Sequence, residues 1–386
     1  MEYDIVCFSH LRWDFVFQRP QQLMTRLSAH HSIYFIEEPV FDAVHGSYFT
    51  TSRDAGHKVF VIIPHVSTGL EPAELIRIQQ ELVESIIDFY GIKKYLVWHY
   101  SPMSYAFSMH LHPLYRVYDC MDELSNFLFA PSCLQENEAA LLRKADIVFT
   151  GGHSLYETKK SSHANIFSFP SSIDKTHFGK ARELRRSGEQ EPADQRAIAA
   201  PRIGFFGVID ERLNIAMLRE LAELRPAWQF ILIGPVVKID PASLPCKKNI
   251  HYLGPKHYGD LPRYLAGWDI AMMPFALNAS TEFISPTKTP EYLAGGVPVI
   301  APSIRDIVTP YFHLGLVSIA DTPEDFIRAG ERILACGMSP AWREKVTDFL
   351  AGMSWDQTVT DMTRLIEEGI RQWSISSTNN NMVSYV

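Results

Sequence analysis

Short apolar runs alternate with helical patterns through the first part of the chain, and residues 4–9 (DIVCFS) form the first run. Such runs, without polar alternation, are typical of strands buried in a parallel sheet. Residues 72–91 carry apolar side chains near helical spacing, from Leu75 to Phe89. The repeated order of strand and helix predicts a doubly wound parallel α/β sheet. The other predicted elements here are strands 32–37, 58–63, 95–98, 115–118, 146–150 and 164–169 and helices 20–27 and 136–144.

A charged segment, residues 179–201, interrupts this alternation, and we interpret it as a linker, partly helical or mobile. A second alternating set follows, with strands at 203–207, 230–234, 250–253, 270–274 and 297–300 and a helix at 214–224. Two sheets in tandem predict two Rossmann-like domains. The predicted boundaries are 1–178 for the first domain, 179–201 for the linker, 202–353 for the second domain, 354–373 for a last helix and 374–386 for a disordered tail.

Composition narrows the class of protein. The 386 residues include 46% hydrophobic and 21% charged residues, which fits a globular chain with two ordinary cores. A net charge of −8 argues against a nucleic-acid partner. The five cysteines lack C-x-x-C spacing, so neither a zinc site nor a disulfide framework is expected. With no signal peptide or membrane span in the sequence, we expect a cytoplasmic protein, and peripheral contact with the inner face of the membrane stays open.

Residues 281–302 (TEFISPTKTPEYLAGGVPVIAP) hold the most informative pattern of the chain. The pattern predicts a loop, a short helix, a glycine stop and a buried strand, with Ser285 before Pro286 as N-cap and first helical residue, or a later start at Pro290. Lys288 at the helix start suits an anion, and Glu291 one turn later suits a pair of hydroxyl groups. Phosphate beside sugar hydroxyls is the chemistry of a nucleotide-sugar. The alternative is a capped helix with a solvated Lys–Glu pair.

The same segment, S-P-x-K-x-x-E-Y-L-A-x-G-x-P-V-I, resembles the donor site of GT-B nucleotide-sugar glycosyltransferases, particularly glycosyltransferase family 4, the group 1 transferases. The resemblance implies two domains facing a central cleft, with the last helix crossing back to the first domain. It also implies that Lys288 neutralises the donor diphosphate and Glu291 binds the ribose. A second family glutamate is absent, because Phe283 stands at its position and Glu282 is off register.

Two glycine turns extend the expected donor site. Gly207 follows one strand, with Arg212 shortly after it, and Gly234 ends the next. Glycine at the carboxyl end of a parallel strand lets the backbone approach phosphate. The resemblance implies that Arg212 joins Lys288 at the diphosphate and that Gly234 lines the base and ribose pocket; a glycine turn with a surface arginine is the alternative. The expected donor-binding set is Gly207, Arg212, Gly234, Ser285, Lys288 and Glu291.

The first strand-to-helix loop resembles the W-x-x-V-x-Q-R-P-Q stretch of a bacterial subset of group 1 transferases. It supplies His10, Trp13 and Arg19 as candidate acceptor-binding residues and Asp14 as a candidate catalytic residue. Core aromatics with charges at the rim are the alternative. Two later strand ends supply His99 and Asp122, which we also expect to be catalytic, with Asp122 as the base of an inverting enzyme. His99 could equally be a satisfied histidine at a strand end.

The resemblance to family 4 implies a hexosyltransferase of polysaccharide biosynthesis. It would move sugar from a nucleotide-diphosphate donor, a UDP- or GDP-sugar, to a carbohydrate or lipid-linked acceptor. The resemblance implies retention of configuration and no cofactor or metal, because positive side chains and helix dipoles serve the diphosphate. Two alternatives stay open, a nucleotide-sugar epimerase on the same scaffold and a non-catalytic nucleotide-sugar-binding protein.

Overall fold

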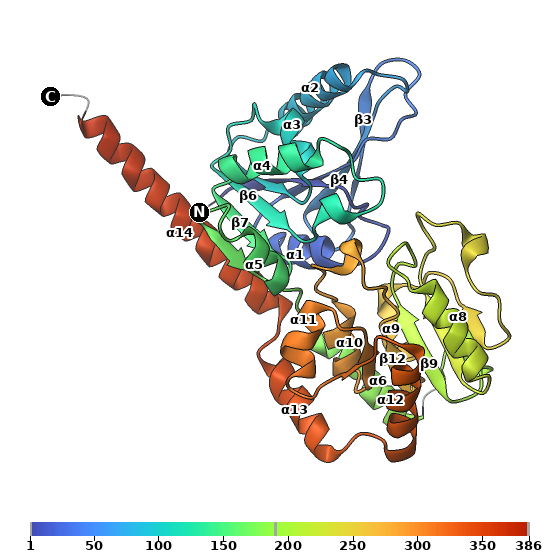
Figure 1. The fold of residues 1–386 in the computed structure, drawn as a ribbon. Coiled ribbons are helices and arrows are strands. Elements are labelled where there is room, and N and C mark those ends of the chain that lie inside the picture. The colour runs from blue at the N-terminus through green and yellow to red at the C-terminus, as the bar shows by residue number, and fades with distance from the viewer. Residues whose placement is uncertain (1, 189–190, 384–386) are drawn as a thin grey trace. The chain divides into compact units, whose positions relative to one another are not determined.

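The computed structural model describes residues 2–188 and 191–383 (Figure 1). The chain forms two compact units. Unit 1 comprises Met1–Ser125, Phe129–Pro170 and Trp355–Val386, and unit 2 comprises Asn126–Leu128 and Ser171–Ser354.

Unit 1 is built on an eight-stranded sheet in the order β3-β4-β2-β1-β5-β6-β7-β8. All neighbours are parallel except β3 and β4, which are antiparallel. β3 is polar and mostly exposed, without the apolar run that marks the other strands, and the sequence did not predict it. The strands are β1 (Asp4–Ser9), β2 (Ile33–Glu37), β3 (Tyr48–Arg53), β4 (Val59–His65), β5 (Tyr95–His99), β6 (Tyr115–Cys120), β7 (Ile147–Thr150) and β8 (Ile166–Ser168).

The two faces of this sheet are covered by different helices. Ile5 and Cys7 of β1 pack on one face with α1 and α14, while Val6 and Phe8 pack on the other with α2. This alternation follows from the two-residue period of a strand and explains why the run is apolar throughout. The helices of unit 1 are α1 (Arg19–Leu27), α2 (Pro72–Tyr90), α3 (Tyr105–Ser108), α4 (Leu134–Lys144), α5 (His153–Lys159) and α14 (Trp355–Val383), with 3-10 turns η1 (Pro102–Ser104) and η2 (Leu124–Asn126).

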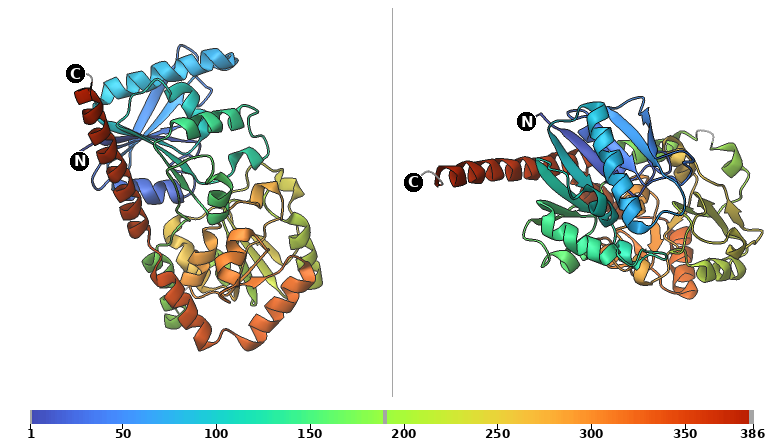
Figure 2. Two further views of the ribbon diagram at one scale, coloured as in Figure 1. Left: turned by 60° about the vertical axis from the view of Figure 1, so that its left-hand side comes forward. Right: turned by 90° about the horizontal axis from the view of Figure 1, so that it is seen from above.

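The last helix, α14, returns to unit 1 and packs beside α1, as Figure 2 shows. Met362, Ile366 and Ile370, spaced one turn apart, bury their side chains in the same core as α1. A Cβ on Gly369 would overlap the Tyr115 hydroxyl, so the helix lies close to β6. The crossing helix is confirmed. It continues past the expected end at Trp373 to Val383, which differs from the disordered tail expected for 374–386; residues 384–386 lie outside the described residues.

Unit 2 contains a six-stranded, wholly parallel sheet in the order β11-β10-β9-β12-β13-β14. Its strands are β9 (Arg202–Phe206), β10 (Gln229–Ile233), β11 (Ile250–Tyr252), β12 (Ile270–Met272), β13 (Val299–Ala301) and β14 (Ser318–Ile319). Its helices are α6 (Lys175–Ser187), α7 (Ala193–Arg196), α8 (Ile215–Leu224), α9 (Leu261–Ala266), α10 (Lys288–Ala294), α11 (Arg305–Ile307), α12 (Pro323–Cys336) and α13 (Pro340–Ala351), with short turns η3 (Pro241–Ser243), η4 (Tyr258–Asp260), η5 (Ala279–Thr281) and η6 (Val308–Phe312).

The segment expected to be a linker, residues 179–201, instead lies within unit 2 and includes the end of α6 and all of α7. Arg182 donates to the Leu293 carbonyl near the end of α10. Arg185 donates to the Ala266 carbonyl at the end of α9. Arginines often satisfy the last carbonyl groups of helices in this way, so these charges hold α6 to its neighbours. The chain passes between the units at Ser125–Asn126, Leu128–Phe129, Pro170–Ser171 and Ser354–Trp355.

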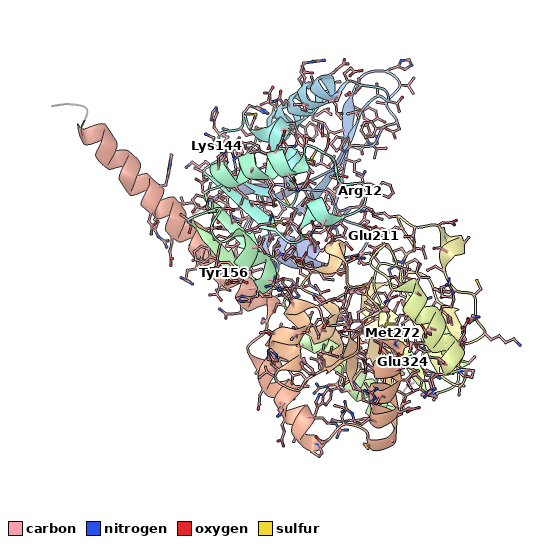
Figure 3. All side chains as sticks on the ribbon, viewed as in Figure 1. Arg12, Lys144, Tyr156, Glu211, Met272 and Glu324 are labelled. Atoms are coloured by element: carbon pink, nitrogen blue, oxygen red, sulfur yellow. The ribbon has the colours of Figure 1, made fainter. Side chains whose placement is uncertain are left out.

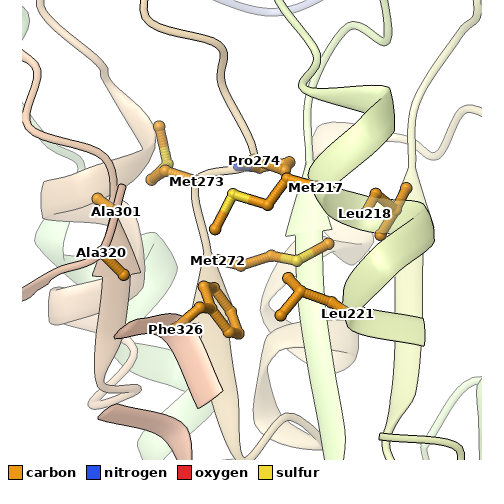
Figure 4. Close-up of a pocket in the computed structure, with 9 residues that line it drawn as sticks. All are labelled: Met217, Leu218, Leu221, Met272, Met273, Pro274, Ala301, Ala320 and Phe326. Atoms are coloured by element: carbon orange, nitrogen blue, oxygen red, sulfur yellow. The ribbon is translucent and has the colours of Figure 1, made fainter. Parts of the chain in front are cut away.

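A small void lies inside unit 2, between α8, α12 and the sheet, and Figure 4 shows the side chains around it. Its volume is about 10 Å³ and its lining is apolar, including Met217, Met272 and Phe326. A space of this size holds at most one water, and an apolar lining offers that water no partner. The void is a packing feature of the core.

Candidate functional site

The helix α10 presents Lys288 as its first residue, and it follows the non-helical residues 284–286. Thr287, not Ser285, is the N-cap residue, and its side chain makes no capping hydrogen bond. The predicted N-cap role of Ser285 is therefore wrong. Pro290 lies inside the first turn, where its missing N–H costs nothing. Ser285 is half-buried just ahead of the helix, and its place in the donor site stays a prediction.

The end of α10 follows the sequence pattern closely. The N–H of Gly296 donates to the Leu293 carbonyl and the N–H of Val297 to the Tyr292 carbonyl, which is the Schellman arrangement. Gly296 has φ +74°, the left-handed conformation that glycine adopts without strain. The glycine stop therefore turns the chain directly into β13 and fixes the length of the helix.

Gly207, Gly234 and Lys288 come together at the carboxyl ends of β9 and β10. These adjacent strands pair Ile233 with Phe206, and each is followed by its glycine. A Cβ on Gly207 would lie 3.3 Å from Cε of Lys288. A Cβ on Gly234 would overlap the Gly207 carbonyl oxygen, so no other residue fits there without a backbone shift. The structure thus gathers three residues that are far apart in the sequence around one strand edge.

Tyr292 holds α10 against this edge. Its hydroxyl accepts a hydrogen bond from the Phe206 N–H at 3.0 Å, and its ring packs edge-on against Phe206 at 4.7 Å between centroids. Tyr292 is fully buried. Sequence reasoning did not assign it a role, although it stands beside Glu291 in the motif. It positions Lys288 and Glu291 relative to the glycine turns.

The carboxyl group of Glu291 is buried and has a raised pKa. Its Oε2 atom is buried and makes no hydrogen bond within the described part of the chain. Burial raises the pKa of Glu291 to about 7, and the nearby Lys288 ammonium partly opposes that shift. Lys288 itself donates to Thr287 Oγ1 at 3.0 Å. A carboxylate that is desolvated but unpaired can accept hydrogen bonds from a ligand's hydroxyl groups.

Arg212 has a partner of its own. Its Nη2 lies 2.6 Å from Oδ2 of Asp210, and its Nε donates to Oδ1 of the same carboxylate at 2.9 Å. Its guanidinium also lies over the Phe275 ring, 5.9 Å from the centroid. Asp210 compensates its charge, so a diphosphate would have to compete with that carboxylate. The role of Arg212 at the diphosphate stays a prediction.

Two of the expected acceptor-binding residues, Arg19 and Trp13, make internal contacts within unit 1. Arg19 is 1% exposed and pairs with the fully buried Asp119 at 2.8 Å, and it also donates to the Phe169 carbonyl. Trp13 is buried against Phe35 and donates its ring N–H to Asp54 at 3.2 Å. Neither side chain presents a free surface to an acceptor sugar, so the structure argues against these two acceptor-binding assignments. They hold the first loop to the core.

His99 is fully buried, and both of its ring nitrogens are engaged. Nδ1 lies 2.7 Å from Ser104 Oγ, and Nε2 lies 2.9 Å from Nη1 of Arg116. Burial, reinforced by the Arg116 charge, holds the pKa of His99 well below its usual range, so the imidazole is neutral. The structure therefore supports the alternative, a satisfied histidine at a strand end, over a catalytic role.

The remaining candidates lie in loops. Asp14 is exposed in the turn before α1, and Asp122 is half-buried in the loop after β6. His10 lines a cavity of unit 1 together with Glu37. Arg12, which is labelled in Figure 3, donates from Nη1 to Oε2 of the same Glu37 at 2.8 Å. The catalytic roles of Asp14 and Asp122 and the acceptor role of His10 stay predictions.

No helix within residues 2–188 and 191–383 is both long and apolar enough to cross a membrane. The same residues hold no group of three or more His, Cys, Asp or Glu side chains arranged to bind a metal ion.

Part of the chain is similar to a known protein family and to a known protein. Residues 200–336 match the family model described as glycosyl transferases group 1, which covers the two glycine turns, Lys288 and Glu291. A protein of Bacillus subtilis (strain 168) named as a teichuronic acid biosynthesis glycosyltransferase, TuaH, is 26% identical over 259 residues, which is 62% of this chain. The match spans 64% of the length of TuaH, less than two thirds of that relative.

Solved structures confirm the fold. The crystal structure of Anabaena HepE in complex with UDP and glucose superimposes with a TM-score of 0.67 at 12% identity, covering 95% of this chain and 100% of that one. Sucrose-phosphate synthase from Thermosynechococcus elongatus superimposes with a TM-score of 0.65 at 16% identity, covering 95% of this chain and 99% of that one. The GT-B fold and the resemblance to group 1 glycosyltransferases, both expected from the sequence, are confirmed.

Proposed function

We propose that this protein is a glycosyltransferase that moves a sugar from a nucleotide-diphosphate donor to a carbohydrate or lipid-linked acceptor. One observation carries the proposal: Gly207, Gly234, Lys288 and Glu291 meet at one strand edge, inside the segment that matches the group 1 family. The glycine turns allow close approach of phosphate, Lys288 supplies positive charge, and Glu291 supplies an acceptor for ribose hydroxyl groups.

The donor is proposed to be a UDP- or GDP-sugar, and the similarity to HepE, whose structure holds UDP and glucose, favours UDP. The similarity to TuaH supports a place in bacterial polysaccharide biosynthesis. We propose that transfer retains configuration and requires no metal, with Lys288 and the backbone N–H groups of the glycine turns carrying the diphosphate charge. The five cysteines are all free thiols, which supports a cytoplasmic location.

The test is nucleotide binding by calorimetry, with UDP, GDP and inorganic pyrophosphate as ligands. A charge-assisted bond to phosphate is worth roughly 1.5–3 kcal/mol, so Lys288→Ala should weaken UDP binding about tenfold or more. Lys248, an exposed lysine of the same unit, gives the matched control Lys248→Ala, which should bind as the wild type does. Equal UDP affinity in both folded variants would remove the donor-site assignment.

Activity assays then separate transfer from the alternatives. Incubation with UDP-sugars should release UDP only when an acceptor is present. Conversion of UDP-GlcNAc in the absence of any acceptor would instead identify an epimerase.

A further inference from the structure

Unit 1 contains a cavity of about 530 Å³, and none of the expected donor-binding residues lines it. It lies at the ends of β1 and β2, and α2, η1, α3 and the start of α4 complete its wall. Its volume falls in the range of small-molecule sites. All of its lining residues come from unit 1, so the cavity is a property of that unit alone.

The lining is mainly hydrocarbon. The apolar side chains that line it include Phe8, Ile36, Leu75, Ile76 and Phe107. Apolar walls of this extent gain free energy by contact with an apolar ligand and gain little from water.

Two polar residues that line the cavity, Glu37 and Ser104, are hydrogen-bonded within the protein. The two carboxylate oxygens of Glu37 accept from the Trp13 N–H at 2.7 Å and from Arg12 at 2.8 Å. Ser104 donates to the Ser101 carbonyl at 2.7 Å and bonds His99 on its other side. These contacts engage Glu37 and Ser104 within the protein.

The rim has a different character. Glu38 and Cys133 are exposed, and Phe41 is 50% exposed. A carboxylate at the rim accepts hydrogen bonds from hydroxyl groups, whereas the interior excludes them. The cavity thus suits a ligand with a hydrocarbon chain inside and a hydroxylated group at the entrance.

We propose that this cavity holds the aliphatic chain of the acceptor, so that the acceptor is a glycolipid whose sugar stands at the rim beside Glu38. This inference rests on the proposed function and selects the lipid-linked class among its acceptors. The chemistry fits an isoprenoid or a straight acyl chain, and the experiment below separates the two.

The experiment measures alkylation of Cys133 by iodoacetamide in the full-length protein. Cys246 and Cys336 are exposed thiols in unit 2 and serve as internal controls. The ligands are methyl, octyl, decyl and geranyl glucosides, each below its micellar concentration. Occupation of the cavity should slow alkylation of Cys133 and leave the two control thiols unchanged, as read by peptide mass spectrometry.

Affinity should rise about fourfold for each added methylene group, so decyl glucoside should protect at a concentration roughly 15-fold lower than octyl glucoside. Tighter binding of geranyl glucoside would identify an isoprenoid chain, and tighter binding of decyl glucoside an acyl chain. Protection by methyl glucoside equal to that by decyl glucoside, or no protection by any of the four, would overturn the proposal.

A pair of variants tests the location. Ala106 lines the cavity, so Ala106→Trp should fill it and weaken protection by decyl glucoside at least tenfold. Ala73 is exposed on α2 outside the lining, so Ala73→Trp should bind as the wild type does. Equal protection in both variants would contradict the assignment. Sugar transfer is not part of this readout, and UDP binding is measured separately, so failure of the cavity and failure of the proposed function are distinct results.

Discussion

Replacing Glu291 by glutamine should stabilise the free protein and weaken its nucleotide complex at the same time. The cause is the carboxyl group described above, buried at Oε2 and without a hydrogen bond in the described chain. Burial raises its pKa from 4.5 in the unfolded chain to about 7 in the folded protein. Each pKa unit corresponds to about 1.4 kcal/mol, and partial exposure of the residue reduces the total cost of the ionised form to about 2–3 kcal/mol.

The sign of the pH dependence follows from proton linkage. Between pH 4.5 and about 7 the folded protein binds more protons at Glu291 than the unfolded chain does. The stability that the neutral carboxyl contributes is therefore fully present below pH 4.5 and is lost as the pH rises through about 7. Glutamine does not ionise, so Glu291→Gln should match the wild type at low pH and exceed it at higher pH.

The assay is thermal and urea unfolding at about pH 4 and about pH 8, on either side of the two pKa values, with Glu344→Gln on the exposed surface of α13 as control. A gain of 2–3 kcal/mol corresponds to a rise of roughly 4–12 °C in melting temperature for a unit of this size, seen only at the higher pH. The same variant should bind UDP about tenfold more weakly and bind pyrophosphate unchanged. A melting difference that is independent of pH, or equal losses for both ligands, would refute the reasoning.

Three further predictions concern other parts of the chain. Arg19→Leu should destabilise unit 1 by about 3–5 kcal/mol, because Asp119 would stay buried without its partner; urea unfolding measures this, and a stable variant with reduced acceptor affinity would restore the acceptor-binding assignment. Asp122→Asn should leave UDP affinity unchanged and lower the transfer rate, and wild-type transfer would exclude Asp122 as a catalytic group. Removal of divalent ions with EDTA should leave transfer unchanged, and recovery of lost activity by added Mg²⁺ or Mn²⁺ would contradict the metal-independent mechanism.

Local chemistry made much of the second half predictable from the sequence. The glycine stop after α10 requires a left-handed residue, and Gly296 adopts that conformation. The glycines after β9 and β10 stand where strand ends approach one another, and the structure brings Gly207 and Gly234 into contact. These features depend on neighbours in the chain or in the sheet, so a pattern of residues is enough to reveal them.

The first-domain assignments depended on tertiary contacts that no local pattern contains. Arg19 and Asp119 are 100 residues apart, and only the fold shows that they satisfy each other. The same reason applies to residues 179–201, where Arg182 and Arg185 appear solvent-exposed in the sequence but bond to helix carbonyl groups. A charged residue at a strand end or in a polar segment is equally compatible with ligand binding and with internal pairing.

The return of α14 to unit 1 has a consequence for synthesis on the ribosome. Unit 2 is almost continuous in the sequence, from Ser171 to Ser354, so it can begin to fold as soon as its own strands have emerged. Unit 1 is synthesised first, yet the face of its sheet that α14 covers stays open until Met362, Ile366 and Ile370 have been translated. The half of the protein that is made first is therefore the half that is completed last, and its apolar face is exposed to aggregation until the final helix covers it.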